Sequence, residues 1–275
     1  IAVVAHGDPA VRGLQSLPTL AGVVNVDGSG QATPPYPVLA DGVVRFVGQP
    51  VVAVIAEDEE AARDAAELVD IVYEAKPSVV EATAALEPQA PQVHDEVAGN
   101  LCFDWLTGDE AATNAALAAA AHVTTIDLVN NRVTAVAMEP RGAIGAWDAA
   151  TGRLTLWTGA QGVHFLRPDL AQVLGVLESS LRVVIPDVGG GFGMKLAPYP
   201  EQALVLSLAR HLDRPVRWIA TRSESFVSDV HARDHVSRVE LGLAADGKFL
   251  ALRVSTVANL GAYLTLFGSQ IPTGG

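Results

Sequence analysis

Residues 186–195 read Pro-Asp-Val-Gly-Gly-Gly-Phe-Gly-Met-Lys, which places four glycines within five positions. The apolar run at 181–185 before them predicts a strand, and residues 200–212 after them predict a helix that begins at a proline. Glycine tolerates positive φ and lets a ligand approach main-chain N–H groups. The chain therefore needs a tight connection here between strand and helix, either a structural turn or a ligand-binding loop.

Phe192 stands among these glycines and favours the ligand-binding interpretation, because an aromatic ring in a flexible turn usually packs against something. The familiar phosphate-binding motifs do not fit. A P-loop needs Gly-Lys followed by Ser or Thr, whereas Met194 precedes Lys195 and Leu196 follows it. A dinucleotide fingerprint that starts at Gly189 needs glycine where the chain has Met194. Neither motif identifies a ligand.

The N-terminal third predicts a compact α/β unit. An apolar strand is expected at 51–56, a helix with acidic residues in its first turn at 57–70, and a second strand at 71–73. If the two strands are parallel, a right-handed crossover joins them. Residues 77–100 are rich in Pro, Ala and Glu without a sustained period, so we expect a domain boundary there.

The rest of the chain mixes the two kinds of element and predicts a mixed α+β and α/β fold. The Ala-rich segment 110–121 predicts a helix, and helix 200–212 is apolar nearly all round, so it should be buried. Asp246-Gly247 separates two alternating runs and predicts a β-hairpin. Further strands are expected at 122–129, 143–147, 153–157, 235–243 and 248–258.

Charge and composition exclude several function classes. The net charge is −13, and residues 57–96 carry 12 acids against Arg63 and Lys76, which is typical of a solvated helix face with a linker. Without a basic stripe, nucleic acid is a poor partner. No 18-residue apolar stretch exists, so no membrane span is expected. The single cysteine, Cys102, excludes a disulfide framework and an iron–sulfur cluster held by this chain alone.

Few residues offer catalytic chemistry by themselves. His231 and His235 lack the HExxH context of a zinc site, and Cys102 has no histidine nearby to make it a nucleophile. Gln161, after the strand that ends at Trp157, is typical of a solvent-facing loop residue when taken alone. Glu139-Pro140-Arg141 indicates salt bridges or strand-end contacts rather than a catalytic acid.

Taken together, several segments resemble a known family. They are VGQPVVAVIAEDEEAARDAAELVDIVYE, NNRVTAVAMEPRGAIG, LTLWTGAQ, RVVIPDVGGGFGMK, YPEQALV, RPVRWIATRSESFVSD, HARDH and DGKFLALRVSTVANLGAY. They resemble the large, molybdopterin-binding subunit of the molybdenum hydroxylases, the xanthine dehydrogenase and aldehyde oxidase group. The similarity is greatest to the aerobic carbon-monoxide-dehydrogenase-type large subunits. VGGGFGMK is the most specific of these segments.

The resemblance implies an ab-hammerhead domain at 1–82, a linker at 83–106, and the first part of a molybdopterin-binding domain at 107–275. It places Gly190, Gly191, Phe192 and Gly193 against the molybdenum centre, and it places Gln161 at an oxo ligand of the metal. The dithiolene sulfurs of the pterin hold the metal, so no direct protein ligand is expected and the chain acts through hydrogen bonds around it.

The implied activity is oxidative hydroxylation of an aldehyde or N-heterocycle, or oxidation of carbon monoxide. The cofactor is expected to be molybdopterin cytosine dinucleotide with Mo. Separate iron–sulfur (2Fe-2S) and FAD subunits would accept the electrons, in a cytoplasmic dimer of heterotrimers. Leu196 stands where xanthine-dehydrogenase-like members carry a purine-contacting Glu, which disfavours a purine substrate.

No catalytic residue is assigned in this sequence. The family's general base and its substrate loop lie beyond position 275, and both ends of the chain fall within strand or loop material. We therefore expect a fragment of a longer protein that is inactive alone. One alternative is a non-catalytic or split subunit that binds the pterin, and a second is a nucleotide-binding enzyme that uses the glycine-rich loop.

Overall fold

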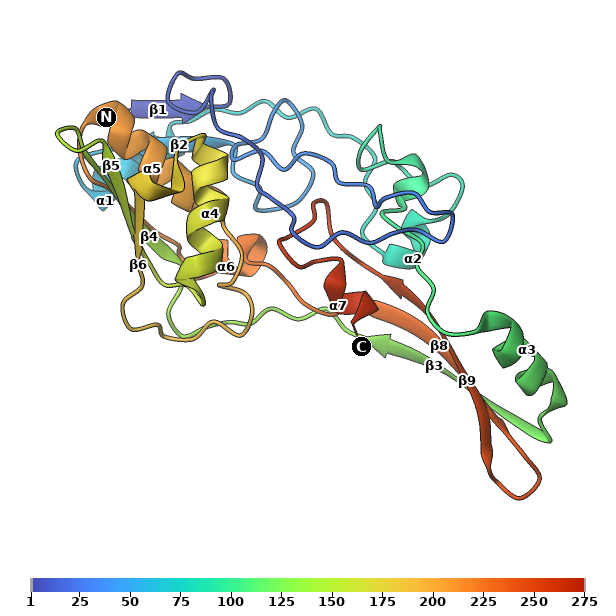
Figure 1. Ribbon diagram of the computed structural model, residues 1–275. Helices are drawn as coiled ribbons and strands as arrows, with labels where there is room; N and C mark the ends of the chain where they lie inside the picture. Colours follow the sequence, from blue (N-terminus) through green and yellow to red (C-terminus); the bar gives the residue numbers. More distant parts are fainter. Residues whose placement is uncertain (1, 275) are drawn as a thin grey trace.

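The computed structural model describes residues 2–274, which form three sheets with helices packed around them (Figure 1). The strands are β1 (Ala2–Ala5), β2 (Val52–Ile55), β3 (His122–Asn130), β4 (Gly142–Asp148), β5 (Arg153–Thr158), β6 (Leu181–Val184), β7 (Val216–Ile219), β8 (His235–Leu243) and β9 (Phe249–Ala258). The helices are α1 (Glu59–Glu67), α2 (Ala82–Ala85), α3 (Glu110–Ala119), α4 (Val163–Leu174), α5 (Pro200–Leu212), α6 (Arg222–Ser228) and α7 (Gln270–Thr273). The predicted mixed α and β content is confirmed.

A four-stranded sheet of order β6-β5-β4-β7 carries the main core. β5 and β6 run parallel, whereas β4 pairs antiparallel with β5 and β7. Helix α5 lies across this sheet beside α4 (Figure 1). Most of its residues are buried, as predicted for a helix that is apolar nearly all round. A Cβ at Gly145 of β4 would collide with the carbonyl of Val205 in α5, so glycine allows the helix to lie directly on the strand.

The predicted N-terminal α/β unit is only partly formed. Strand β2 and helix α1 are present, but β2 pairs antiparallel with β1 in a two-stranded sheet. The prediction of a strand at 71–73, with its crossover, is wrong. Val72 is 92% exposed and Tyr73 is 64% exposed. Apolar, β-branched sequence favours a strand by packing on a half-buried sheet face, and no sheet face covers these side chains.

The strands β3, β8 and β9 form an antiparallel arm that projects from the rest of the molecule (Figure 1). Its hairpin turns at Asp246-Gly247, as predicted. Helix α3 packs on β8 and β9, where Gly242 leaves room for Leu117. Several apolar side chains of the arm remain exposed: Val123, Ile126, Leu128, Leu252 and Val254. Within residues 2–274, no helix has the length and apolar character to cross a membrane.

Candidate functional site

The glycine-rich loop and Gln161 meet at one edge of the four-stranded sheet. Gln161 follows β5, and residues 186–195 follow β6, its parallel neighbour. Because parallel strands end at the same edge, the two connections leave the sheet side by side, and ligands of such sheets bind outside the carboxyl ends of the strands. The structure thus brings together the two segments that the sequence singled out separately.

The loop packs so closely against its neighbours that a side chain at Gly189 or Gly191 would collide with them. A Cβ at Gly191 would lie 2.6 Å from the side-chain amide of Gln161, and a Cβ at Gly189 would lie 2.5 Å from the Cβ of Glu139. Gly190 and Gly193 have φ of +105° and +86°, a region that side chains disfavour. Two of these glycines therefore permit close approach, and two permit the turn.

Gln161 is oriented by the main chain of Lys195. The Lys195 N–H donates to Oε1 of Gln161 at 3.1 Å, and the Gln161 N–H donates to the Lys195 carbonyl at 3.1 Å. Because a backbone N–H can only donate, the amide oxygen of Gln161 must face the loop. Its Nε2 group makes no hydrogen bond within residues 2–274. An exposed Gln161 held in this way presents two N–H donors at the rim of the site.

Glu139 and Lys195 form an ion pair beneath the loop, with Nζ and Oε2 2.7 Å apart. Lys195 is buried, whereas the Glu139 side chain is partly exposed. Partial burial opposes ionisation of Glu139, but the hydrogen bonds from Lys195 and the Gly189 N–H, with the charge of Lys195, hold its pKa below its usual value. Sequence reasoning missed Lys195, whose position at the end of the glycine run does not reveal its partner 56 residues away.

Arg141 forms a second, fully buried network below the site. Its guanidinium donates to Asp229 at 2.6 Å and to Glu201 at 2.7 Å, and it stacks 3.9 Å from the centre of the Tyr199 ring. Burial alone would lower the pKa of Arg141, but Glu201 and Asp229 raise it. Of the two contacts predicted for Glu139 and Arg141, salt bridges or strand-end contacts, the structure shows salt bridges, each with partners elsewhere in the chain.

Phe192 projects from the loop with 78% of its surface exposed and with φ of +53°. A bulky residue at positive φ is strained and is found where the surroundings or a ligand enforce it. The described part of the chain does not bury this ring. The packing partner that the sequence suggested for Phe192 stays a prediction.

The site offers main-chain groups and a side-chain amide rather than a cluster of metal-ligating side chains. Residues 2–274 hold no group of three or more His, Cys, Asp or Glu side chains able to bind a metal. His231, one of the two closely spaced histidines, contacts the Phe226 carbonyl at 3.0 Å instead. Main-chain approach at glycines and the outward amide of Gln161 are the features that remain.

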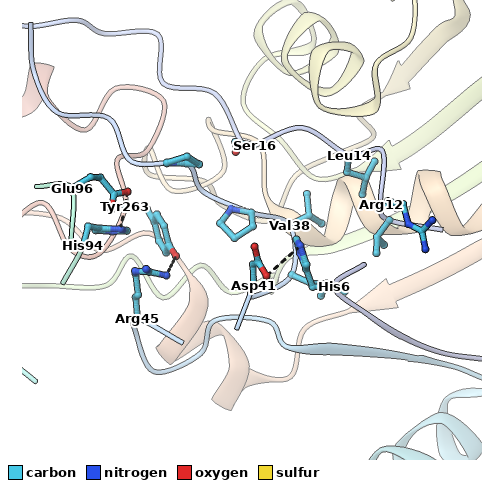
Figure 2. Close-up of a pocket in the computed structure, with 14 residues that line it drawn as sticks. His6, Arg12, Leu14, Ser16, Val38, Asp41, Arg45, His94, Glu96 and Tyr263 are labelled. Atoms are coloured by element: carbon cyan, nitrogen blue, oxygen red, sulfur yellow. Dashed lines mark hydrogen bonds and ion pairs between the residues drawn. The ribbon is translucent and has the colours of Figure 1, made fainter. Parts of the chain in front are cut away.

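A separate cleft of about 340 Å³ lies between the N-terminal segment and the region of Tyr263 (Figure 2). Figure 2 shows His6 beside Asp41, Arg45 beside Tyr263 and His94 beside Glu96. His6 lies 3.5 Å from Asp41, the His94 ring bonds the Ala262 carbonyl at 2.6 Å, and Arg45 lies 3.5 Å from the Tyr263 hydroxyl. These contacts join distant segments of chain, and the cleft shares no lining residue with the glycine-rich loop.

Two family profiles match the chain. The molybdopterin cofactor-binding domain matches residues 93–274, and the a/b hammerhead domain of aldehyde oxidase and xanthine dehydrogenase matches residues 9–77. The carbon monoxide dehydrogenase large chain of Hydrogenophaga pseudoflava is 36% identical over 262 residues, which cover 91% of this chain and 31% of that one. The nicotine 6-hydroxylase large subunit of Paenarthrobacter nicotinovorans is 34% identical over 233 residues, which cover 82% and 28%.

Solved structures show the same similarity. Quinoline 2-oxidoreductase from Pseudomonas putida 86 superposes with a TM-score of 0.83 at 36% identity, covering 93% of this chain and 32% of that chain. This chain therefore spans about a third of the length of the relatives that it matches. The profile matches and these relatives agree on one assignment. The chain belongs to the xanthine dehydrogenase and aldehyde oxidase family of molybdenum hydroxylases and corresponds to part of the molybdopterin-binding large subunit.

Proposed function

We propose that the chain forms the molybdopterin-binding part of an oxidoreductase large subunit. The activity would be oxidative hydroxylation of an aldehyde or N-heterocycle, or oxidation of carbon monoxide. One observation carries the proposal: Gly191 lies against the Gln161 side chain so closely that a single Cβ would occupy the same space. A glycine backbone packed against an amide that the loop orients suits a flat, polar cofactor.

The proposed cofactor contacts are Gln161, Gly190, Gly191, Phe192 and Gly193. When bound, molybdopterin would supply the two-electron redox chemistry at its own metal. Gln161 would donate its two amide N–H groups to the cofactor, because its oxygen is already bonded to the loop. The glycines would let main-chain N–H groups reach the cofactor, and the exposed Phe192 ring would cover it and exclude water.

The wider assignments rest on the family resemblance. Domains at 1–82 and 107–275 with a linker at 83–106, the cytosine dinucleotide form of the cofactor, and a cytoplasmic location stay predictions. The same holds for separate 2Fe-2S and FAD subunits in a dimer of heterotrimers. Carbon monoxide dehydrogenase and nicotine 6-hydroxylase relatives support more than one substrate class. Leu196, which replaces the purine-contacting Glu, still disfavours a purine.

The test uses the complete large subunit, produced with its iron–sulfur and flavin subunits. Molybdenum is counted by elemental analysis and pterin by fluorescence after oxidation, and turnover is measured with an aldehyde, an N-heterocycle and carbon monoxide. We expect about one molybdenum and one pterin per large subunit. Gln161→Ala should leave folding intact and lower turnover about 10–100-fold, as losses around a metal centre do.

Two results would contradict the proposal. Loaded enzyme with unchanged turnover in Gln161→Ala would show that Gln161 is only a loop residue. Absence of pterin, with calorimetric binding of ATP or NAD that Gly191→Val abolishes, would support the nucleotide-binding alternative. Pterin without turnover on any substrate would instead favour the non-catalytic subunit that only holds the cofactor.

A further inference from the structure

The Glu139 side chain joins the two ends of the glycine-rich loop. One carboxylate oxygen, Oε2, accepts from the Gly189 N–H at 3.0 Å and from Lys195 Nζ at 2.7 Å. The main chain of Glu139 adds two bonds: its N–H donates to the Gly189 carbonyl at 3.1 Å, and its carbonyl accepts from Lys195 Nζ at 2.9 Å. One residue therefore closes residues 189–195 into a ring.

The same ring is connected to Gln161. Lys195 is the residue whose N–H and carbonyl make the paired hydrogen bonds to Gln161, each at 3.1 Å. A shift of Lys195 would move the Gln161 amide and the end of the loop together. The position of the amide donors thus depends on the Glu139–Lys195 pair, although neither charged side chain touches Gln161 within hydrogen-bond distance.

Packing restricts both charged groups to this arrangement. A Cβ at Gly159 would lie 3.0 Å from Oε2 of Glu139 and 3.6 Å from Nζ of Lys195. Gly189 meets Glu139 on another side, because a Cβ there would lie 2.5 Å from the Glu139 Cβ. The Lys195 side chain is only 1% exposed, so water cannot replace Glu139 as its partner. A buried ammonium without its counter-charge is strongly disfavoured.

We propose that Glu139 and Lys195 are positioning residues, a loop clamp that fixes the glycine-rich loop and the Gln161 amide in one geometry toward the molybdopterin. The inference rests on the proposed function, since it concerns the same site. The pair would determine how the cofactor is held, in addition to any contribution that it makes to the stability of the fold.

Lys195→Met is the primary variant. Methionine fills the space of the aliphatic part of the lysine side chain. The Glu139 side chain is 42% exposed, so water can solvate its charge once Lys195 is replaced. Glu139→Gln is the second variant, because its amide oxygen can still accept both bonds that Oε2 accepts while the charge is removed. Arg238→Met, which breaks the exposed Arg238–Asp127 pair on the arm, is the matched control.

The variants are made in the complete large subunit with its partner subunits. Four properties are measured: melting temperature, molybdenum and pterin per chain, the electron paramagnetic resonance spectrum of the partly reduced molybdenum, and turnover per loaded site. We expect Lys195→Met to release cofactor about 10–100-fold faster and to alter the resonance spectrum. Glu139→Gln should show the same changes together with a lower melting temperature, because the buried Lys195 ammonium loses its counter-charge. Arg238→Met should match the wild type.

A double-variant cycle of Glu139→Gln with Lys195→Met sharpens the result, because residues that act through one contact give effects that do not add. The clamp is refuted if the loaded variants keep the wild-type spectrum, turnover and cofactor release. It is also refuted if only the melting temperature falls. Failure of the proposed function looks different, since the wild-type protein itself would then hold no molybdenum or pterin.

Discussion

Glu139 and Arg141 lie two residues apart, yet their ion pairs belong to different regions of the molecule. Arg141 points inward, where Glu201, Asp229 and the Tyr199 ring enclose it beneath the four-stranded sheet. Glu139 points to the rim, where it joins the ends of the glycine-rich loop. Two charged residues in one short segment can therefore have different roles. Arg141 joins elements of the core, and Glu139 holds the loop at the site.

Arg141→Met tests the inner network most severely. The variant leaves the carboxylates of Glu201 and Asp229 buried without a counter-charge, so we expect a loss of about 3–5 kcal/mol in the free energy of unfolding. Chemical denaturation of the complete subunit measures this loss. A loss below about 1 kcal/mol would show that the buried Arg141 network contributes no more stability than an exposed ion pair.

Gly191→Ala tests the rim. The added Cβ would lie 2.6 Å from the Gln161 side chain, which is exposed and can swing away, so we expect a small change in melting temperature. Turnover per loaded site should fall about tenfold or more, because the amide would leave its position. Gly13→Ala, outside the site, is the matched comparison: among the described residues no atom lies within 4 Å of a Cβ there, and the backbone is not at positive φ. Equal turnover per loaded site in both variants would show that the contact with Gln161 is unimportant.

Asp169 extends the comparison to a buried carboxylate without a counter-charge. Its Oδ2 has no hydrogen-bond partner within residues 2–274, and burial raises its pKa to about 6. The folded state therefore binds more protons than the unfolded state between about pH 4 and 6, and stability falls as the pH rises through that window. We expect Asp169→Asn to gain about 1–2 kcal/mol at pH 7.5.

Denaturation of both proteins across pH 4–8 checks this prediction. The gain from Asp169→Asn should shrink toward pH 4, where the wild-type carboxyl is already neutral. A constant difference between the two proteins at every pH would show that ionisation of Asp169 does not affect folding.

The smallest effect is expected at the arm. Arg238 and Asp127 are both exposed, at a distance of 3.3 Å, and exposed pairs contribute little. Arg238→Met should change the free energy of unfolding by no more than about 0.5 kcal/mol. A larger loss in denaturation would mean that the outer pairs of this protein carry more stability than their exposure suggests.

Local sequence predicted most elements correctly. The helix 200–212 and the hairpin at Asp246-Gly247 were visible because periodicity and turn residues act within a few positions. The strand at 71–73 was wrong, because a strand needs a partner and a covering surface that no local pattern reveals. Helix α4 lies in a segment for which no element was predicted.

The candidate site divides in the same way. The glycine run and its strand–loop–helix setting could be read from the sequence, and the family resemblance singled out Gln161. The role of Lys195 could not be read, because its partners Glu139 and Gln161 lie 56 and 34 positions away. Spacing in the chain gives no information on such contacts, which depend on how β5 and β6 lie next to each other.

The sequence by itself determined the composition of the loop, the order of most elements and the family. Glycine backbone freedom and hydrophobic periodicity depend only on residues close together in the sequence, so they can be predicted from it. Only the tertiary structure decided that Glu139 faces the rim while Arg141 faces the core, and that one carboxylate oxygen serves both ends of the loop. These choices follow from burial and from the parallel pairing of β5 with β6, which exist only once the chain has packed.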